Sequence, residues 1–394
     1  MERTIDECFF QIQNGANIKQ GDVDGGYPIT RIETTANDKF NRDRMGYAGI
    51  TDLSKYESYV LEDGDLLMSH INSVQYLGRT VLYEKKENET IIHGMNLLRL
   101  KARRDIINPA YARYCFYGHP FRSQVANITK KSVNQASFAV KDLKQIKIDV
   151  PEMNQQNQIV EILNKTSELI EKRQQELDAF DELIKARFVE IFGDTVINPM
   201  GWTEQRLDEY ITFLTSGSRG WAQYFTDEES EFFITIKNVK NNHITLDDIQ
   251  YVNAPKNKEA ERTKVKAGDL LISITADLGR TGVVDDKIAD CGAYINQHLS
   301  LVRLDTDRIN PLYVSYFLET SGGKRQFESK NQNGVKAGLN FEAIKSLKIL
   351  VPPIEMQEQY LDFVKQVDKS KVAVQKALDE AQLLFDSLMQ EYFG

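Results

Sequence analysis

Residues 154–192, NQQNQIVEILNKTSELIEKRQQELDAFDELIKARFVEIF, decide how this chain is organised. Their mostly apolar seam residues recur at alternating spacings of four and three, which is the heptad pattern of a coiled-coil helix. The seam consists of Ile159, Leu163, Thr166, Ile170, Arg173, Leu177, Phe180, Ile184, Arg187 and Ile191. At about 1.5 Å per residue, a helix of this length extends roughly 57 Å.

The same pattern occurs a second time, 201 residues further along the chain. Its seam consists of Tyr360, Val364, Val367, Lys371, Val374, Leu378, Ala381, Phe385, Leu388 and Tyr392. Each copy follows a proline and ends on Phe-Gly, where glycine suits the C-terminal cap of a helix. We therefore predict two long helices that pair as an antiparallel coiled coil. The alternative is that each is an amphipathic helix packed on its own domain.

The sequence that precedes each helix is repeated as well. Corresponding blocks are 64–69 and 268–273, 77–80 and 278–281, 96–100 and 300–304, and 108–111 and 310–313. They occur in one order at offsets of 201 to 205, which indicates a tandem duplication. Residues 198–202, NPMGW, open the second half and have no partner before Met1.

Within each half, the local patterns are typical of an α+β domain. Short β-branched and aromatic runs at 58–61, 65–69, 80–83 and 96–100 predict strands. Residues 111–117 and 313–317 follow Asn-Pro and predict helices, and residues 140–150 and 341–351 predict a short helical turn before a strand. The predicted fold class is two tandem α+β domains, each followed by a long helix. The predicted segments are a first domain (1–151), a first helix (152–194), a second domain (195–353) and a second helix (354–394).

Composition excludes several classes of protein. The 394 residues are 41% hydrophobic and 27% charged, as in ordinary globular proteins. No apolar run approaches the ~20 residues of a membrane span, and none resembles a signal peptide. Cys8, Cys115 and Cys291 are far apart and odd in number, so neither a disulfide framework nor a CxxC metal site is indicated. We expect a cytoplasmic protein without a membrane partner.

The net charge of −9 is unevenly distributed along the chain. Residues 152–194 contain ten acidic and five basic residues, and residues 355–394 contain eight and four, so the helices account for the whole charge. Elsewhere, residues 122–147 contain six basic residues against one acidic, and residues 322–348 contain six against two. A neutral body with local basic stretches is compatible with binding to DNA.

The sequence lacks the motifs that catalysis would require. It has neither a GxxxxGK[ST] phosphate loop nor a GxGxxG after a strand, and its five histidines lie without partners at metal-ligand spacing. The Asn-Pro pairs resemble part of an amino-methyltransferase motif, but both lack its second proline, so helix starts are favoured. Asp285-Asp286-Lys287 resembles a nuclease pair only loosely and has no equivalent in the first half. The pattern favours a protein that reads a partner over an enzyme.

Basic loops rich in amides are the candidate DNA-binding elements. Lysines suit phosphates, and Asn, Gln and Arg can form paired hydrogen bonds with base edges. Two such loops, 129–135 and 330–336, lie at matching places in the repeat, and shorter clusters occur at 42–44 and 216–219. The candidate DNA-binding residues are Arg42, Arg44, Lys130, Lys131, Ser132, Asn134, Gln135, Ser218, Arg219, Lys330, Asn331, Asn333 and Lys336.

Taken as a whole, the chain resembles the specificity subunits of type I restriction-modification enzymes. The resemblance rests on the tandem halves, each with an Asp-Glu opening, then Gly-Asp-Leu-Leu, then a strand, proline and helix. The junctions at 150–159 and 351–357 and the opening at 198–202 are similar to those of the family. The sequence departs from the family pattern in lacking a Trp-bearing opening before Met1.

The resemblance implies two target-recognition domains, each reading one half of a bipartite, asymmetric site in double-stranded DNA. The helix pair would set the spacer, since one heptad moves a domain by ~10 Å. Two methyltransferase (modification) subunits would dock on the helices and flip the adenine to be methylated. Restriction/translocase subunits would join them. The resemblance implies that this chain carries no cofactor and that S-adenosylmethionine, ATP and Mg are bound by the partner subunits.

Two other hypotheses remain. A duplicated coiled-coil scaffold that joins other proteins without DNA would fit the net acidity. A self-sufficient methyltransferase or nuclease would need motifs that the sequence lacks.

Overall fold

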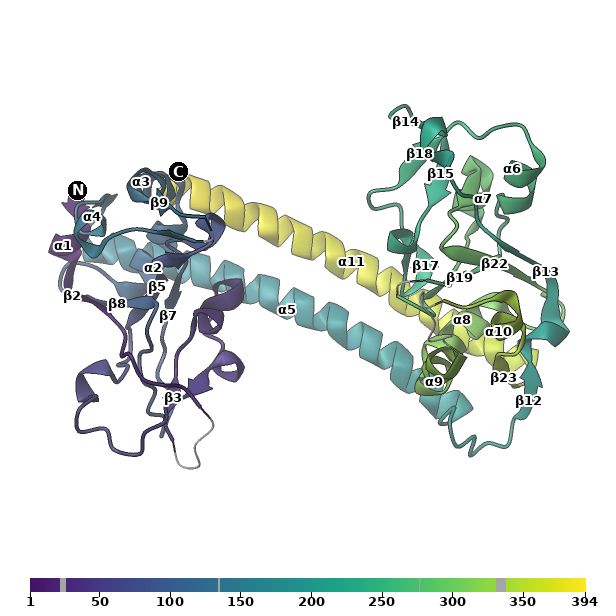
Figure 1. The fold of residues 1–394 in the computed structure, drawn as a ribbon, viewed down its shortest axis with the longest axis horizontal. Coiled ribbons are helices and arrows are strands. Elements are labelled where there is room, and N and C mark those ends of the chain that lie inside the picture. Colours follow the sequence, from purple (N-terminus) through teal and green to yellow (C-terminus); the bar gives the residue numbers. More distant parts are fainter. Residues whose placement is uncertain (22–25, 134, 276, 331–337) are drawn as a thin grey trace. The chain divides into compact units, whose positions relative to one another are not determined.

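The computed structural model describes residues 1–21, 26–133, 135–275, 277–330 and 338–394. These residues form two compact units, one of residues 1–175 with 375–394 and the other of residues 176–374. Each unit contains a globular domain and parts of both long helices, α5 (Met153–Phe192) and α11 (Ile354–Phe393) (Figure 1). The predicted long helices are therefore confirmed, while the division into segments at residues 151, 194 and 353 stays a prediction.

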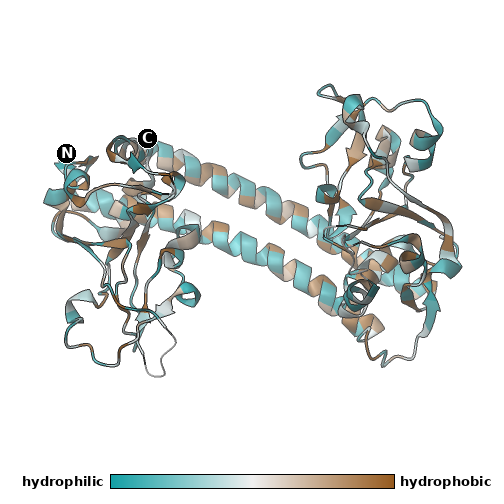
Figure 2. Cartoon of the chain, viewed as in Figure 1, coloured by the Kyte–Doolittle hydropathy of each residue, from teal (hydrophilic) through white to brown (hydrophobic). Residues whose placement is uncertain are grey.

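The heptad seams are the packed faces of the two helices. Every predicted seam position is buried or half-buried, and hydrophobic residues recur along both helices among hydrophilic ones (Figure 2). In the second unit, Lys371 forms an ion pair with Asp181, and the ring of Tyr360 lies 5.5 Å from that of Phe192. From the first pair to the second, the residue number falls along α11 and rises along α5, so the two helix segments run antiparallel in this unit.

The globular domain of the first unit is built on a four-stranded antiparallel sheet of order β2-β8-β5-β7. A three-stranded sheet, β6-β10-β9, and the pairs β1-β11 and β3-β4 surround it. The strands are β1 (Glu2–Thr4), β2 (Phe9–Asn14), β3 (Pro28–Ile29), β4 (Gly46–Tyr47), β5 (Leu66–Ser69), β6 (Ile71–Asn72), β7 (Thr80–Leu82), β8 (Leu97–Ala102), β9 (Lys130–Lys131), β10 (Ala136–Ser137) and β11 (Lys147–Asp149). The helices are α1 (Ile5–Cys8), α2 (Pro109–Tyr117), α3 (His119–Ile128) and α4 (Val140–Leu143).

The second unit repeats this plan with an addition. Its main sheet has the order β13-β22-β19-β20-β17-β16. A further sheet has the order β14-β18-β15-β21, and the described residues of the first unit form no sheet of equivalent order. The strands are β12 (Thr203–Arg206), β13 (Ile211–Ser216), β14 (Phe225–Thr226), β15 (Glu231–Ile234), β16 (Val239–Lys240), β17 (Asn242–Ile244), β18 (Gln250–Val252), β19 (Leu270–Ser273), β20 (Thr281–Val283), β21 (Ala293–Ile295), β22 (Leu299–Leu304) and β23 (Lys348–Val351). The helices are α6 (Lys258–Thr263), α7 (Asp286–Cys291), α8 (Pro311–Glu319), α9 (Ser321–Lys330) and α10 (Phe341–Lys345).

Both long helices contribute to the core of each unit. In the first unit, Ile159 and Leu163 of α5 and Phe393 of α11 pack with the sheet and with α2. In the second unit, Phe192 of α5 and Tyr360 of α11 occupy the corresponding positions beside α8. Each hydrophobic core therefore includes residues of both long helices, and the alternative that each helix packs only on the domain preceding it is wrong.

The Asn-Pro pairs are helix starts, as the sequence favoured. The side chain of Asn108 accepts a hydrogen bond from Ala110 N, and that of Asn310 accepts one from Leu312 N. Their own backbone N–H groups donate to the side chains of two fully buried glutamines, Gln156 at 2.8 Å and Gln357 at 3.0 Å. These glutamines lie in the first turns of α5 and α11, so each long helix is fixed to its domain by an equivalent buried hydrogen bond.

Two local predictions are wrong. Residues 57–59 form a 3-10 turn rather than a strand, because Tyr59 N and Val60 N donate to carbonyls three residues back. The alignment of 96–100 with 300–304 is shifted by two residues. Leu66 pairs with Leu100, whereas the equivalent Leu270 pairs with Val302, so β8 and β22 correspond at an offset of 202. Arg99 and Arg303 are therefore not equivalent, although both pair with the aspartate that precedes the strand β5 or β19.

Candidate DNA interface

In the first unit, the predicted basic loop forms a hairpin beside a second loop. Lys130 and Lys131 form β9, which pairs with β10, and β10 pairs in turn with β6. Lys130, Lys131, Ser132 and Gln135 are all exposed, and Ser132 closes the turn by donating its N and Oγ to the Gln135 carbonyl at 2.8 and 2.7 Å. We call residues 130–133 and 135–137 the lysine hairpin. Within the described residues, the ammonium groups of Lys130 and Lys131 have no carboxylate partner, so the hairpin presents two unpaired cations.

The loop that follows β6 was missed by sequence reasoning. In this 73–79 turn, Val74 and Tyr76 are 51% and 36% exposed, and Gln75 is exposed between them. The Arg122 guanidinium donates to the Leu77 carbonyl at 2.7 Å and to the Gln75 carbonyl at 3.3 Å. The turn therefore holds an amide and two apolar groups outward on an anchored backbone. Its sequence contains only one amide, Gln75, and one basic residue, Arg79, which is too few to mark a basic or amide-rich loop. The pairing of β6 with β10 brings the turn beside the lysines.

In the second unit, a chain of hydrogen bonds joins three loops. Arg219 Nε donates to Gln297 Oε1, Gln297 Nε2 lies 3.1 Å from His298 Nε2, and His298 Nδ1 lies 2.7 Å from Thr275 Oγ1. We call these four residues the second polar network. Arg219 is exposed and the others are half-buried, so the network combines a cation, an amide and an imidazole at the surface. Of the four, the sequence had indicated only Arg219.

The two groups share one connection of the repeat. The 73–79 turn connects β5 and β6 with β7, and Thr275 lies in the connection between the corresponding strands β19 and β20. Leu339, just after the second predicted loop, donates its N–H to the Ile274 carbonyl at 2.9 Å, much as Phe138 donates to the His70 carbonyl at 3.3 Å. Each domain thus brings the same two connections together at one end of its main sheet.

Several candidate residues have other partners. Ser218 is only 2% exposed, and its hydroxyl lies 3.0 Å from that of Thr263, which favours a structural role. Arg42 forms two hydrogen bonds with Glu89, at 2.9 and 2.7 Å, and this guanidinium lowers the pKa of Glu89 to about 2. Lys330, at the end of α9, donates to Ser346 Oγ at 2.9 Å. We leave Ser218 and Arg42 out of the proposed interface. Arg44, in the same turn as Arg42, is exposed and remains a candidate.

The remaining candidates, Asn134, Asn331, Asn333 and Lys336, lie outside the described residues. Within the described ranges, no group of His, Cys, Asp and Glu is arranged to hold a metal ion. No described helix is long and apolar enough to cross a membrane.

The fold itself defines a class of protein. The solved S subunit of the type I restriction-modification system of M. genitalium aligns over 100% of this chain and 96% of its own, with a TM-score of 0.60 and 13% identity. At that identity the likeness concerns the fold, which is that of duplicated α+β domains carried on long helices.

The chain belongs to the family of type I restriction modification DNA specificity domains, whose pattern matches residues 2–179 and 199–381. A Methanocaldococcus jannaschii protein named as the MjaX specificity subunit is 28% identical over 396 residues, which cover 95% of this chain and 90% of that protein. The Escherichia coli EcoBI specificity subunit is 17% identical over 327 residues, covering 77% and 68%. The predicted family is confirmed, and the chain is a DNA-recognition subunit of the type I restriction-modification class.

Proposed function

We propose that the chain reads a bipartite, asymmetric DNA sequence, with one half-site bound by each globular domain, and that it thereby directs adenine methylation and restriction by partner subunits. In the first domain, the lysine hairpin contacts phosphates while the 73–79 turn reaches base edges. In the second domain, Arg219 and the polar network take the same part. The two halves carry different side chains at these places, so the half-sites differ in sequence.

The observation that supports this proposal most directly is the equivalence of the two faces. A duplicated domain that places exposed cations, amides and turns at corresponding ends of corresponding sheets has two surfaces suited to the same kind of ligand. Lysines are suited to phosphates, which fix the register, whereas Gln75, Arg219 and Gln297 have the donors and acceptors that distinguish base pairs.

The partner subunits are part of the proposal. Two methyltransferase subunits dock on the outer faces of the helices and supply S-adenosylmethionine chemistry, and restriction subunits add ATP-driven translocation and cleavage. Large apolar side chains on these helices are exposed, including Leu183 at 46%, Val372 at 71% and Leu383 at 69%. We assign these side chains to the surface that the partner subunits cover. We place the assembly in the cytoplasm, where the host DNA is.

The test is to co-express the chain with the methyltransferase subunit encoded beside it and to map methyl-adenine across the host DNA by long-read sequencing. The proposal expects a single bipartite motif that disappears when this chain is omitted. An assembled, folded complex that produces no chain-dependent methylation would instead support the protein scaffold. That alternative also predicts no DNA protection by any complex that contains the chain.

A further inference from the structure

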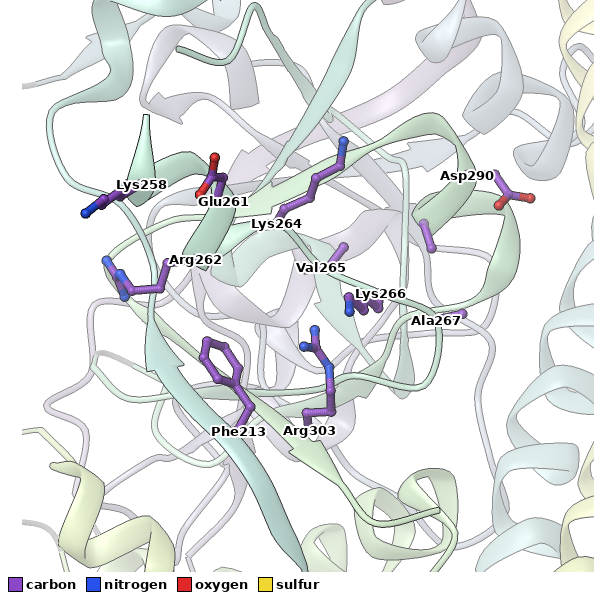
Figure 3. Close-up of a pocket in the computed structure, with 11 residues that line it drawn as sticks. Phe213, Lys258, Glu261, Arg262, Lys264, Val265, Lys266, Ala267, Asp290 and Arg303 are labelled. Atoms are coloured by element: carbon purple, nitrogen blue, oxygen red, sulfur yellow. The ribbon is translucent and has the colours of Figure 1, made fainter. Parts of the chain in front are cut away.

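The second unit contains a basic pocket on the side of its main sheet that faces the added strands. It lies between α6, the segment 264–267, the end of α7 and the strands β13 and β22, and its volume is about 910 Å³. Figure 3 shows the ring of Phe213 and the guanidinium of Arg303 extending in the same direction from the two strands, with Lys266 close by. The pocket therefore has an aromatic and cationic floor.

Its charges are mostly positive and only partly neutralised. Five basic side chains line it, Lys258, Arg262, Lys264, Lys266 and Arg303, against two acidic ones, Glu261 and Asp290. Arg303 is held by Asp269 through two hydrogen bonds of 2.7 Å, and Lys264 lies 3.2 Å from Glu231. Within the part of the chain that the structure describes, the ammonium groups of Lys258 and Lys266 have no carboxylate partner. Two cations are thus free to bind an anion.

The basic residues that line the pocket have no counterpart in the equivalent segment of the first half. Residues 256–266 contain five basic and two acidic residues, whereas the equivalent residues 52–62 contain one basic and three acidic. In a chain with a net charge of −9, such a concentration of lysine and arginine is a local exception. A cation cluster that is only partly compensated by carboxylates raises the local concentration of anions.

Hydrogen bonds connect the pocket to the second polar network. Arg262 donates to the Ser216 carbonyl at 2.6 Å, and Thr263 Oγ1 lies 3.0 Å from Ser218 Oγ. Both contacts fix α6 to the loop of Ser216 and Ser218, and Arg219 follows Ser218 directly in this loop. The pocket and the proposed base-reading surface are therefore parts of one continuous, mutually supported region of the second domain.

We propose that this pocket binds backbone phosphates of the DNA duplex that flanks the half-site read by the second domain. The inference rests on the proposed function and adds a contact that carries no sequence information. Lysine is suited to this role because a compact ammonium group neutralises phosphate irrespective of the base attached. The charged residues in the equivalent segment 52–62 of the first domain are mostly acidic, so the grip on flanking DNA is asymmetric.

A free polyphosphate, such as the triphosphate of a nucleotide, presents the same chemistry. The open shape of the pocket and its connection to the loop of Arg219 favour DNA. The two sources are separated by measuring DNA binding and polyphosphate binding on the same proteins.

The experiment compares the full chain, purified with its methyltransferase subunit, with the double variant Lys258→Gln, Lys266→Gln. Fluorescence anisotropy with a duplex containing the recognised site is measured over a range of salt concentrations. The matched control is Lys85→Gln, Lys86→Gln, which removes two neighbouring exposed lysines of the first domain. A second duplex ends at the boundary of the half-site read by the second domain, and titration calorimetry with inorganic tripolyphosphate covers the free ligand.

The expected result is a salt slope shallower by about two for the pocket variant, with about a tenfold loss of affinity at low salt and an unchanged methylation motif. The difference from wild type should vanish on the shortened duplex. Unchanged DNA binding with a loss of tripolyphosphate binding would overturn the DNA assignment in favour of a free polyphosphate. If neither changes, the pocket is not a phosphate site. A wild-type complex without site-specific binding would refute the proposed function instead, and the tripolyphosphate titration would still decide the nature of the pocket.

Discussion

Replacing the next-to-last residue of the chain should destabilise the first domain. Phe393 lies at the end of α11, is 7% exposed, and packs in the core of the first unit with its ring centroid 5.2 Å from that of Tyr111. Its backbone also closes on α2, where the space beside Gly118 is filled by the Phe393 carbonyl and Cβ. Phe393→Ala would therefore leave a cavity between α2 and the helix pair.

The size of the effect follows from the buried ring. Truncation of a buried phenylalanine costs about 3–5 kcal/mol, and the lower value applies here because a helix end can partly collapse into the space. For a unit of this size, each kcal/mol shifts the melting temperature by about 2–4 °C, so a decrease of about 9 °C is expected. Leu383→Ala is the matched control, since Leu383 lies on the same helix and is 69% exposed.

Thermal unfolding gives the total effect, and hydrogen exchange read by mass spectrometry locates it. Protection should fall in α2 and in the first turns of α5, whereas α8 of the second unit should keep its protection. The reciprocal variant Phe192→Ala removes a ring that is 1% exposed and packs 5.0 Å from Tyr313, and it should have the opposite pattern. Equal protection of α2 in Phe393→Ala and in the control, or a loss confined to α8, would refute the reasoning.

Further predictions concern the first domain. Arg42→Ala should lower the stability of this domain by about 2 kcal/mol in chemical unfolding, because Glu89 loses its partner, and DNA binding should be retained. The control is Arg44→Ala, at an exposed neighbouring position. Weakened DNA binding without destabilisation would contradict the structural role of Arg42. The pKa of Glu89 is lowered from 4.5 to about 2, so its contribution to stability is present above pH 4.5 and is lost as the pH falls toward 2. Glu89→Gln should flatten this part of the curve of unfolding free energy against pH. An unchanged curve would exclude the ion pair as the source of the pH dependence. Lys130→Ala with Lys131→Ala should make the salt slope of DNA binding shallower by about two without altering the methylated motif, and an equal slope would remove the hairpin from the interface. Gln75→Ala should relax one base position of one half-site, and an identical methylation profile would count against the 73–79 turn.

Much of the fold could be read from local patterns. A heptad seam is a property of consecutive residues, so both long helices were predicted to within a residue of their observed starts. Asn before Pro has the same local meaning in both halves, since the side chain can cap only the helix that begins there. The duplication was equally visible because both copies keep their blocks in order.

The candidate site was less predictable, for reasons that depend on long-range packing. Ser218 was chosen for its type, yet strand pairing buries it, and the ion pair of Arg42 depends on a carboxylate 47 residues away. The 73–79 turn has too few basic and amide residues to indicate a DNA-binding loop. It becomes a candidate only because β6 pairs with β10 and so lies beside the lysine hairpin. The shift of β22 by two residues has the same origin, because register is decided by pairing across the sheet.

By itself, the sequence determined that this protein is a tandem pair of α+β domains with two heptad helices and the family to which it belongs, because repeats and periodicity are written in neighbouring residues. Only the tertiary structure decided which part of each helix completes which core, and which loops meet at the surface. Phe393 packs in the domain at the other end of the sequence, and Lys258, Lys264 and Lys266 gather into a pocket beside β13 and β22. Such contacts join residues far apart in the chain, and chain folding rather than local preference brings them together.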